Sequence, residues 1–153
     1  MRSLALLLLP LVLTACGGGK APTPAKPHAG SSATASVGGA TLQASTVALA
    51  DLNATVAARY GLAAGDDGLL LLVTVRDAAG NGIDPGDLQL QATAAVLPDP
   101  PGALALRAIR TGDMTDYLGV VRASAPASIA VKLAATRGGA RTEIATTAEL
   151  QPR

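Results

Sequence analysis

From residue 40 onward the chain is divided into short strand-like segments, some of which alternate apolar and polar residues, with Gly, Pro, Asn and Asp between them. Alternation with a period of two is typical of β-strands, because successive side chains point to opposite faces of a sheet. The segments lie at residues 41–49, 68–76, 88–97, 104–110, 117–123, 129–136 and 141–150. About seven short strands with frequent turns predict an all-β protein, with an Ig-like antiparallel β-sandwich as the nearest architecture.

Two of these segments carry more specific signals. Residues 69–73 are four leucines followed by a valine, so both faces of the strand are apolar, which favours a central buried strand. The last two segments are separated by Gly138 and Gly139, and paired glycines between alternating segments indicate a tight hairpin, because its turn needs positive φ angles. Another turn is expected at residues 77–82.

One segment near residues 53–60 predicts a short helix rather than a strand. Asn53 can cap its N-terminus by accepting a hydrogen bond from a free backbone N–H, and Gly61 can end it in the left-handed conformation. Three apolar side chains spaced by four residues share one face, which we expect to pack against the core. These side chains are Leu52, Val56 and Tyr60.

The N-terminus has the features of a secretory signal peptide. Arg2 supplies a positive charge, and residues 4–13 form an apolar run broken only by a proline. This run is about half of the ~20 residues that a helix needs to span the hydrocarbon core, so it indicates a signal peptide rather than a membrane anchor. The run ends in Leu13-Thr14-Ala15-Cys16, which resembles the lipobox of bacterial lipoproteins.

The lipobox resemblance implies that residues 1–15 are removed as a lipoprotein signal peptide and that Cys16 is the lipidation site, with a diacylglycerol on its thiol. The membrane is then a partner through the lipid anchor at Cys16, because several acyl chains bind far more tightly than one. Gly17 stands where enteric bacteria use Asp to retain lipoproteins at the inner membrane. We therefore expect the periplasmic face of the outer membrane.

Residues 17–39 consist mainly of Gly, Ala, Ser, Thr and Pro. Such a segment buries too little apolar surface to offset the entropy of ordering it, so we expect a flexible tether. The predicted organisation is a signal peptide at 1–15, a lipidated Cys and tether at 16–39, and one β-sandwich domain at 40–151.

Two motifs of the domain occur in a fixed order. Residues 56–62 read Val-Ala-Ala-Arg-Tyr-Gly-Leu and precede the leucine-rich strand, and residues 107–113 read Arg-Ala-Ile-Arg-Thr-Gly-Asp and precede Tyr117. In order and spacing they resemble the domain-of-unknown-function family 4426, which consists of uncharacterised bacterial envelope proteins. The resemblance implies a short helix ending in Tyr-Gly before a leucine-rich strand. It brings no established activity or catalytic residue.

Composition and charge exclude several functional classes. The formal net charge is +1 and aromatic residues make up 1% of the chain, so the electrostatic footprint and the stacking platforms of a nucleic-acid-binding protein are missing. Cys16 and His28 are the single Cys and the single His, which rules out an internal disulfide and a four-ligand zinc site. We expect no cofactor.

The predicted domain lacks the residues of a hydrolytic triad. Ser45, Ser124 and Ser128 are present, but no His or Cys follows residue 40 to activate a serine hydroxyl. A Ser–Lys arrangement with Lys132 is the alternative, although a Lys on an alternating strand is typically solvated. We therefore expect that the protein is not an enzyme.

The segment 77–87 is rich in oxygen-bearing side chains. They are Asp77, Asn81, Asp84 and Asp87. Ca²⁺ takes about six to eight oxygen ligands, so a small-ligand or calcium-binding sensor or carrier that uses this loop is one alternative function. The spacing departs from an EF-hand, because Ala79 and Leu88 occupy ligand positions. The other interpretation is a hairpin turn, in which Asp and Asn accept local backbone hydrogen bonds and Gly80 and Gly82 supply positive φ.

Arg107, Arg110 and Asp113 form a charged group beside a predicted turn at Gly112. On a strand, residues 107 and 110 point to opposite faces, so their side chains form one anion clamp only if a bulge intervenes. Arg110 can instead pair with Asp113 across the turn, and we favour this structural role over anion binding.

The lipobox, the tether and a domain without catalytic residues together predict a periplasmic lipoprotein of the outer membrane. Its expected role is a non-enzymatic binding or structural accessory module of the cell envelope. An unidentified envelope protein is the expected kind of partner, and nucleic acid is not.

Overall fold

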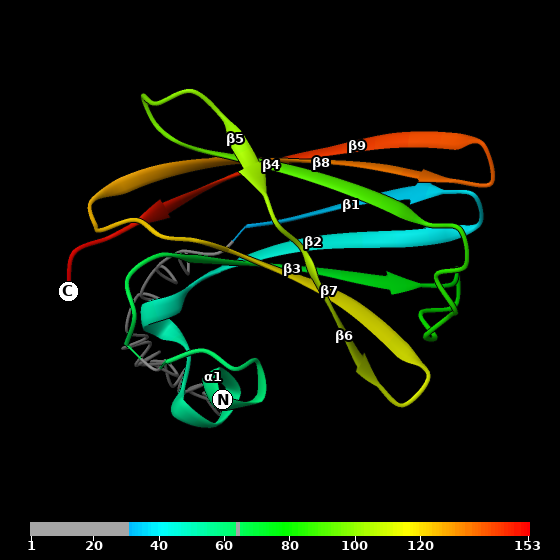
Figure 1. The fold of residues 1–153 in the computed structure, drawn as a ribbon, viewed down its shortest axis with the longest axis horizontal. Helices are drawn as coiled ribbons and strands as arrows, with labels where there is room; N and C mark the ends of the chain where they lie inside the picture. Colours follow the sequence, from blue (N-terminus) through cyan, green and yellow to red (C-terminus); the bar gives the residue numbers. More distant parts are fainter. Residues whose placement is uncertain (1–30, 64) are drawn as a thin grey trace, which may run out of the picture.

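The computed structural model describes residues 31–63 and 65–153 (Figure 1). The predicted signal peptide, Cys16 and the tether up to residue 30 lie outside the described residues. The strands are β1 (Ser32–Val37), β2 (Ala40–Ala48), β3 (Leu69–Arg76), β4 (Gln89–Val96), β5 (Gly102–Leu104), β6 (Arg107–Thr111), β7 (Met114–Val121), β8 (Ala127–Arg137) and β9 (Ala140–Leu150). A 3-10 turn, η1 (Leu49–Asp51), and one short helix, α1 (Ala54–Arg59), separate β2 from β3. No helix among these residues is long and apolar enough to cross a membrane.

The strands form two antiparallel sheets that pack face to face (Figure 1). The five-stranded sheet has the order β1-β2-β3-β7-β6, and the four-stranded sheet has the order β5-β4-β8-β9. The prediction of an all-β sandwich is therefore confirmed. The order of elements along the chain also agrees with the predicted segments. Two strands, β1 and β5, were not predicted as separate strands.

The first additional strand is β1, which lies in the segment that we expected to be tether. The predicted domain start at residue 40 is wrong, because the strand begins at Ser32. Its inward side chains, Ala33 and Ala35, pack against the core, and Val37 is 3% exposed. In β1 small apolar residues alternate with Ser and Thr, a composition that is also typical of a linker. The segment forms a strand because it pairs with the edge of β2.

The second additional strand arises because the predicted segment 104–110 changes sheet. β5 pairs with β4 in one sheet, whereas β6 pairs with β7 in the other, so the chain crosses between the layers. Gly119 of β7 leaves room for this crossing. A Cβ at Gly119 would lie 3.0 Å from the Cδ2 atoms of both Leu104 and Leu106.

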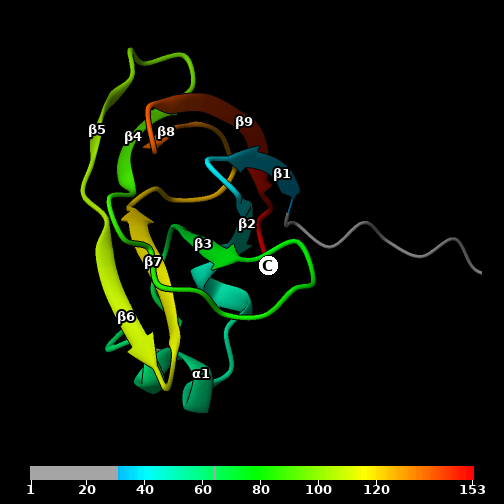
Figure 2. The same ribbon diagram turned by 90° about the vertical axis from the view of Figure 1, so that its right-hand side faces the viewer.

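β3 is the central strand, as its apolar run predicted, and it is buried on both faces. Leu71, Val73 and Val75 on its inner face are fully buried in the sandwich core. Leu70, on the outer face, packs with Leu49 in a second, smaller cluster. Figure 2 shows α1 on the side of the five-stranded sheet that faces away from the four-stranded sheet.

The helix has the predicted caps. Asn53 Oδ1 accepts a hydrogen bond from the backbone N–H of Val56 at 2.8 Å, and Gly61 has a φ of +67°. Tyr60 packs against the second cluster, as expected. The most deeply buried helical residue is Ala57, at 1% exposure.

The register gives the sandwich two distinct ends. At one end, which we call the proximal end, β1, β3 and β8 begin and β2, β7 and β9 finish. Ala48 pairs with Leu69 there, and Ala127 pairs with Leu150. The opposite end, which we call the distal end, carries the β1–β2, β6–β7 and β8–β9 turns and the β3–β4 loop (Figure 1).

Ser31 fixes the chain to the proximal end as it enters the domain. The backbone N–H of Thr46 donates to Ser31 O at 2.9 Å, and Ser31 Oγ donates to Thr147 O at 2.9 Å. Ser31 Oγ also shares a hydrogen bond with Thr146 Oγ1. These contacts join β2 of one sheet to β9 of the other, so the chain enters the sandwich at the edge between the two layers.

Candidate functional site

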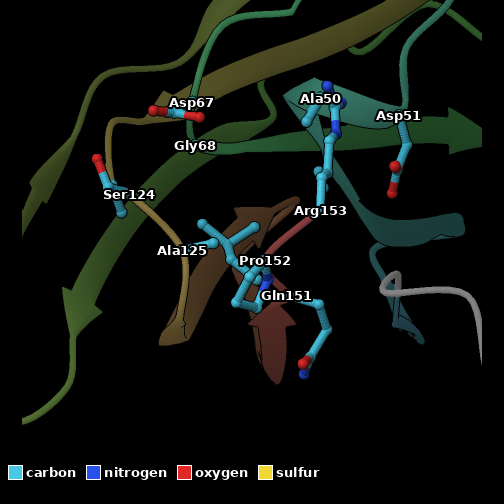
Figure 3. A pocket seen from close by; sticks show the side chains of 12 residues that line it. Ala50, Asp51, Asp67, Gly68, Ser124, Ala125, Gln151, Pro152 and Arg153 are labelled. Atoms are coloured by element: carbon cyan, nitrogen blue, oxygen red, sulfur yellow. The ribbon is translucent and has the colours of Figure 1, made fainter.

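Each end of the sandwich carries a hollow. The proximal hollow has a volume of about 440 Å³ and opens where Ala48, Gly68 and Leu150 end or begin their strands (Figure 3). Asp67 and Ser124 lie on one side of it, and Arg153 projects from the other (Figure 3). Its walls combine alanine side chains with a few scattered polar groups.

The distal hollow is smaller, about 260 Å³, and lies between the β3–β4 loop and the β6–β7 turn. Its lining residues are Gly82, Asp84, Pro85, Arg110, Gly112, Asp113 and Thr115. A Cβ at Gly82 would lie 2.4 Å from Met114 Cγ, so the absence of a side chain there allows the loop to pack tightly on the hairpin. The two charged segments that the sequence singled out therefore meet in one place.

The candidate calcium ligands do not converge. Asp77 Oδ1 accepts hydrogen bonds from the N–H groups of Ala79 and Asn81 at 2.8 Å, and Asp77 Oδ2 accepts one from Asn81 Nδ2 at 3.1 Å. Asp87 Oδ2 turns toward the β8–β9 turn and accepts from the N–H of Gly138 at 2.9 Å. The local hydrogen bonds of Asp77 and the φ of +89° at Gly80 are those of the turn interpretation. Gly82 does not have the expected positive φ, and the turn does not join a hairpin, because β3 and β4 belong to different sheets.

Asp84 is the member of the four that lines the distal hollow, and its Oδ1 accepts a hydrogen bond from the N–H of Gly86 at 2.9 Å. Among residues 31–63 and 65–153, no three His, Cys, Asp or Glu side chains are grouped to hold a metal ion. The hydrogen bond from the Asn81 side chain, helped by backbone N–H groups, lowers the pKa of Asp77, so this carboxylate stays charged to hold the turn together.

The predicted pair between Arg110 and Asp113 is wrong. The ion pairs of the described chain are Arg76–Asp116 at 2.9 Å, Arg122–Asp66 at 2.5 Å and Arg141–Glu143 at 3.1 Å. The Gly112-Asp113 turn closes the hairpin with a φ of +59° at Gly112, and Arg110 and Asp113 both line the hollow without closing on each other. Arg107 points to the opposite face, as predicted, and donates to Tyr60 O.

The serines and the lysine considered for nucleophilic chemistry lie apart. Lys132 is exposed on β8, where its cross-strand neighbours are Thr93 and Ala145. Ser128 Oγ donates to Glu149 Oε1 at 2.6 Å. Ser45 lies on β2 of the other sheet, and Ser124 lines the proximal hollow. The structure does not bring any of these serines to Lys132.

Arg137 holds the distal end together, and sequence reasoning missed it. Its Nε donates to Pro85 O at 3.1 Å, its Nη2 to Asp84 O at 3.4 Å, and its Nη1 to Gly38 O. The acceptors are backbone carbonyls from two other loops. No residue type identifies these carbonyls in the sequence, so the sequence shows only that Arg137 directly precedes the Gly-Gly turn.

We expect Arg137→Ala to lower the free energy of unfolding by about 2 kcal/mol, because a single side chain holds three carbonyls of two loops. Urea denaturation monitored by circular dichroism measures this loss. Arg141→Ala is the matched control, since Arg141 and Glu143 are both 66% exposed and such a pair contributes at most about 1 kcal/mol. Equal losses in the two variants would show that Arg137 does not organise the loops.

Comparison with known proteins agrees with this architecture. The model of the family described as Domain of unknown function (DUF4426) matches residues 35–150. A DUF4426 family protein from Pseudomonas aeruginosa has a similar structure, with a TM-score of 0.60 and 14% sequence identity over 80% of this chain and 96% of that chain. No curated protein matches the chain.

A second structural neighbour is a copper-bound variant of FetP from uropathogenic Escherichia coli strain F11. Its TM-score is 0.50 at 11% sequence identity, over 79% of this chain and 90% of that chain. At these identities the two structures show a shared fold alone. The family match covers α1, the leucine-rich β3 and the β6–β7 hairpin, which are the elements that carry the two sequence motifs. The chain therefore belongs to the DUF4426 family.

Proposed function

We propose that the protein is a lipid-anchored, non-enzymatic binding or structural accessory module of the cell envelope, held at the periplasmic face of the outer membrane. The observation that supports this proposal is the placement of Ser31, where the chain enters the domain at the proximal end. An anchor at Cys16 would therefore direct the distal loops away from the membrane.

The length of the connection fits this arrangement. Because β1 belongs to the domain, residues 17–30 are what separates Cys16 from Ser31. A Gly- and Pro-containing coil of that length spans an r.m.s. distance of about 20 Å. The domain would stay close to the membrane, with the distal loops at its far side, where a partner in the periplasm can reach them.

A non-enzymatic role is supported by the side chains available. No His or Cys occurs after His28, and Lys132 has no serine beside it. Acyl-transfer chemistry on Ser124 or Ser128 would need a base that activates the hydroxyl group. A binding or structural role needs only a rigid fold and exposed groups, which the distal end supplies.

Metal binding is not part of the proposal. The solved FetP variant contains copper, which proteins hold mainly through His, Cys and Met side chains. After residue 30 this chain has neither His nor Cys, and it has one Met, at position 114. The calcium alternative lacks geometric support, because Asp77 bonds to its own turn whereas Asp87 bonds to Gly138 of the β8–β9 turn.

The anchoring step is tested by Cys16→Ser in the full chain expressed in a Gram-negative bacterium. We expect the unaltered protein in the outer-membrane fraction with its leader removed, and the variant as an unprocessed precursor without incorporated radiolabelled palmitate. Gly17→Asp is a matched second variant, which we expect to move to the inner-membrane fraction in an enteric host. The proposal fails if Cys16→Ser is processed and fractionates like the unaltered protein.

A further inference from the structure

We propose that the distal hollow binds a small amino acid with a second ammonium group, such as lysine or ornithine, either free or at the carboxyl end of a short peptide. This inference rests on the proposed function, in which the distal end is the part presented to the periplasm. It goes further by naming the residues that make contact and the chemistry of the ligand.

Arg110 and Thr115 form one wall of the hollow. They are cross-strand partners in the β6–β7 ladder, so their side chains lie next to each other on the same face. Arg110 is exposed and belongs to none of the ion pairs of the described chain. A free guanidinium group presents paired N–H donors that match the two oxygens of a carboxylate.

Thr115 brings a hydroxyl group to the lining of the hollow. It is a polar residue with 7% exposure, and it lines the hollow beside Arg110. The described residues contain no fully enclosed polar side-chain atom without a hydrogen-bond partner, so the Thr115 hydroxyl is either bonded or open to solvent. A hydroxyl group can both donate and accept, so it suits either end of a ligand that enters the hollow.

Asp84 and Asp113 are the acidic residues that line the hollow. Asp84 comes from the β3–β4 loop and Asp113 from the β6–β7 turn. Asp84 Oδ1 is engaged by the N–H of Gly86, which leaves Oδ2 as an acceptor. Neither carboxylate pairs with Arg110, so charges of both signs face the same space. Carboxylates in this position are suited to ammonium groups.

The charge of the hollow selects among amino acids. One Arg and two Asp give a formal charge of −1, which is the complement of an amino acid with one carboxylate and two ammonium groups. The hollow contains no aromatic side chain on which a base or a sugar could stack. A simple anion would be repelled by the two Asp residues, and a simple diamine would leave Arg110 without a partner.

The size of the hollow agrees with a ligand of this kind. A volume of about 260 Å³ lies below the about 300–1,000 Å³ of pockets that hold drug-sized ligands, so it suits a ligand of amino-acid size. The walls are also rigid, because Arg137 and the Asp77 turn hold the β3–β4 loop in place.

The test is isothermal titration of the full chain, purified in detergent, with L-lysine, L-ornithine, glycine and cadaverine. We expect saturable binding of lysine and ornithine, and at least tenfold weaker binding of glycine and of cadaverine, which lack one of the required groups. A tripeptide Ala-Ala-Lys with a free carboxyl end separates the two sources of ligand. Tighter binding of the tripeptide than of lysine assigns the site to peptide ends, and weaker binding assigns it to the free amino acid.

Three variants assign the contacts. We expect Arg110→Ala to weaken lysine binding at least tenfold and not to weaken the binding of cadaverine, because cadaverine has no carboxylate for Arg110 to hold. Thr115→Val should weaken lysine binding and Thr115→Ser should preserve it, which separates the hydroxyl group from packing. Arg141→Ala, which removes an exposed Arg outside the hollow, is the control that should bind normally.

The proposal is overturned if lysine and ornithine show no saturable heat, or if Arg110→Ala and Arg141→Ala bind lysine equally. Both Arg side chains are exposed, so thermal melting should show that the two variants are folded. Binding in detergent does not depend on where the protein is anchored. A negative titration with normal membrane fractionation therefore rejects the ligand and retains the proposed anchoring, and the reverse result does the opposite.

Discussion

Gly68→Ala is expected to lower the free energy of unfolding by at least about 3 kcal/mol, one of the largest losses that a single methyl group can cause in this domain. Gly68 directly precedes β3 and has a φ of +133°, a conformation that L-residues rarely adopt. An added Cβ would lie 2.2 Å from Val121 O, which belongs to the neighbouring strand β7. Relief of this overlap requires β3 and β7 to move apart.

The damage should extend beyond these two strands. Gly68 O accepts a hydrogen bond from the N–H of Leu49 at 2.9 Å, and this bond holds η1 against the start of β3. Displacement of Gly68 would therefore loosen the segment that covers the second cluster. Hydrogen exchange should become faster at Leu49 and along α1 before it does so in β8 and β9.

Gly65→Ala is the matched control for Gly68→Ala. Gly65 also has a positive φ, +83°, but an added Cβ there would meet no atom within 4 Å. We expect a loss of about 1 kcal/mol, which reflects backbone strain alone. Urea denaturation of both variants gives the comparison. If the two losses were equal, the close approach of Gly68 to β7 would have no energetic importance.

Leu71→Ala is expected to lower the free energy of unfolding by about 3–4 kcal/mol. Leu71 is fully buried in the sandwich core at the middle of the central strand. Removing its side chain loses the transfer free energy of the buried groups and leaves a cavity that two paired sheets cannot easily close. Natural domains have a total stability of about 5–15 kcal/mol, so this loss is a large fraction of it.

Leu72→Ala, at the next position of the same strand, is the control for Leu71→Ala. Its side chain points to the outer face of the five-stranded sheet and is half-buried. We expect a loss of about 1 kcal/mol, because less apolar surface is returned to water and no enclosed cavity forms. A larger loss at Leu72 than at Leu71 would contradict the assignment of the core to the inner face.

Much of the local structure was predictable because it depends on neighbouring residues. The paired glycines at 138–139 have φ angles of +55° and +77°, which close the β8–β9 hairpin as the sequence predicted. Asn53 caps the helix through a hydrogen bond to a residue three positions away. These features follow from backbone sterics and from hydrogen bonds between neighbouring residues, so the local sequence is sufficient to predict them.

The assignment of β1 and the change of sheet between β5 and β6 were not predictable in this way. The Ala and Ser residues of β1 become a strand because the edge of β2 is free to receive them. The segment 104–110 has no turn residue to mark a boundary, and its division depends on Leu104 and Leu106 packing over Gly119. Each outcome depends on partners that are far away in the sequence. Alternation indicates that a segment is a strand, but it does not show which strand it pairs with.

The candidate site, too, was predictable in its residues but not in how they come together. The sequence drew attention to Asp84, Arg110 and Asp113 as charged residues near turns, but it placed them in two unrelated groups. Their meeting with Thr115 in one hollow depends on the close contact of Gly82 with Met114 and on the hold of Arg137 on two loops. These contacts join segments that are tens of residues apart.

The sequence alone determined the β class, the central strand and the capped helix, because each depends on residue type and short-range periodicity. Only the tertiary structure decided where the domain begins, which strands share a sheet, and which end of the sandwich faces away from the chain entry at Ser31. The physical reason is that sheet pairing and loop packing are fixed by contacts between distant segments, whose free energy is gained only when the whole core assembles.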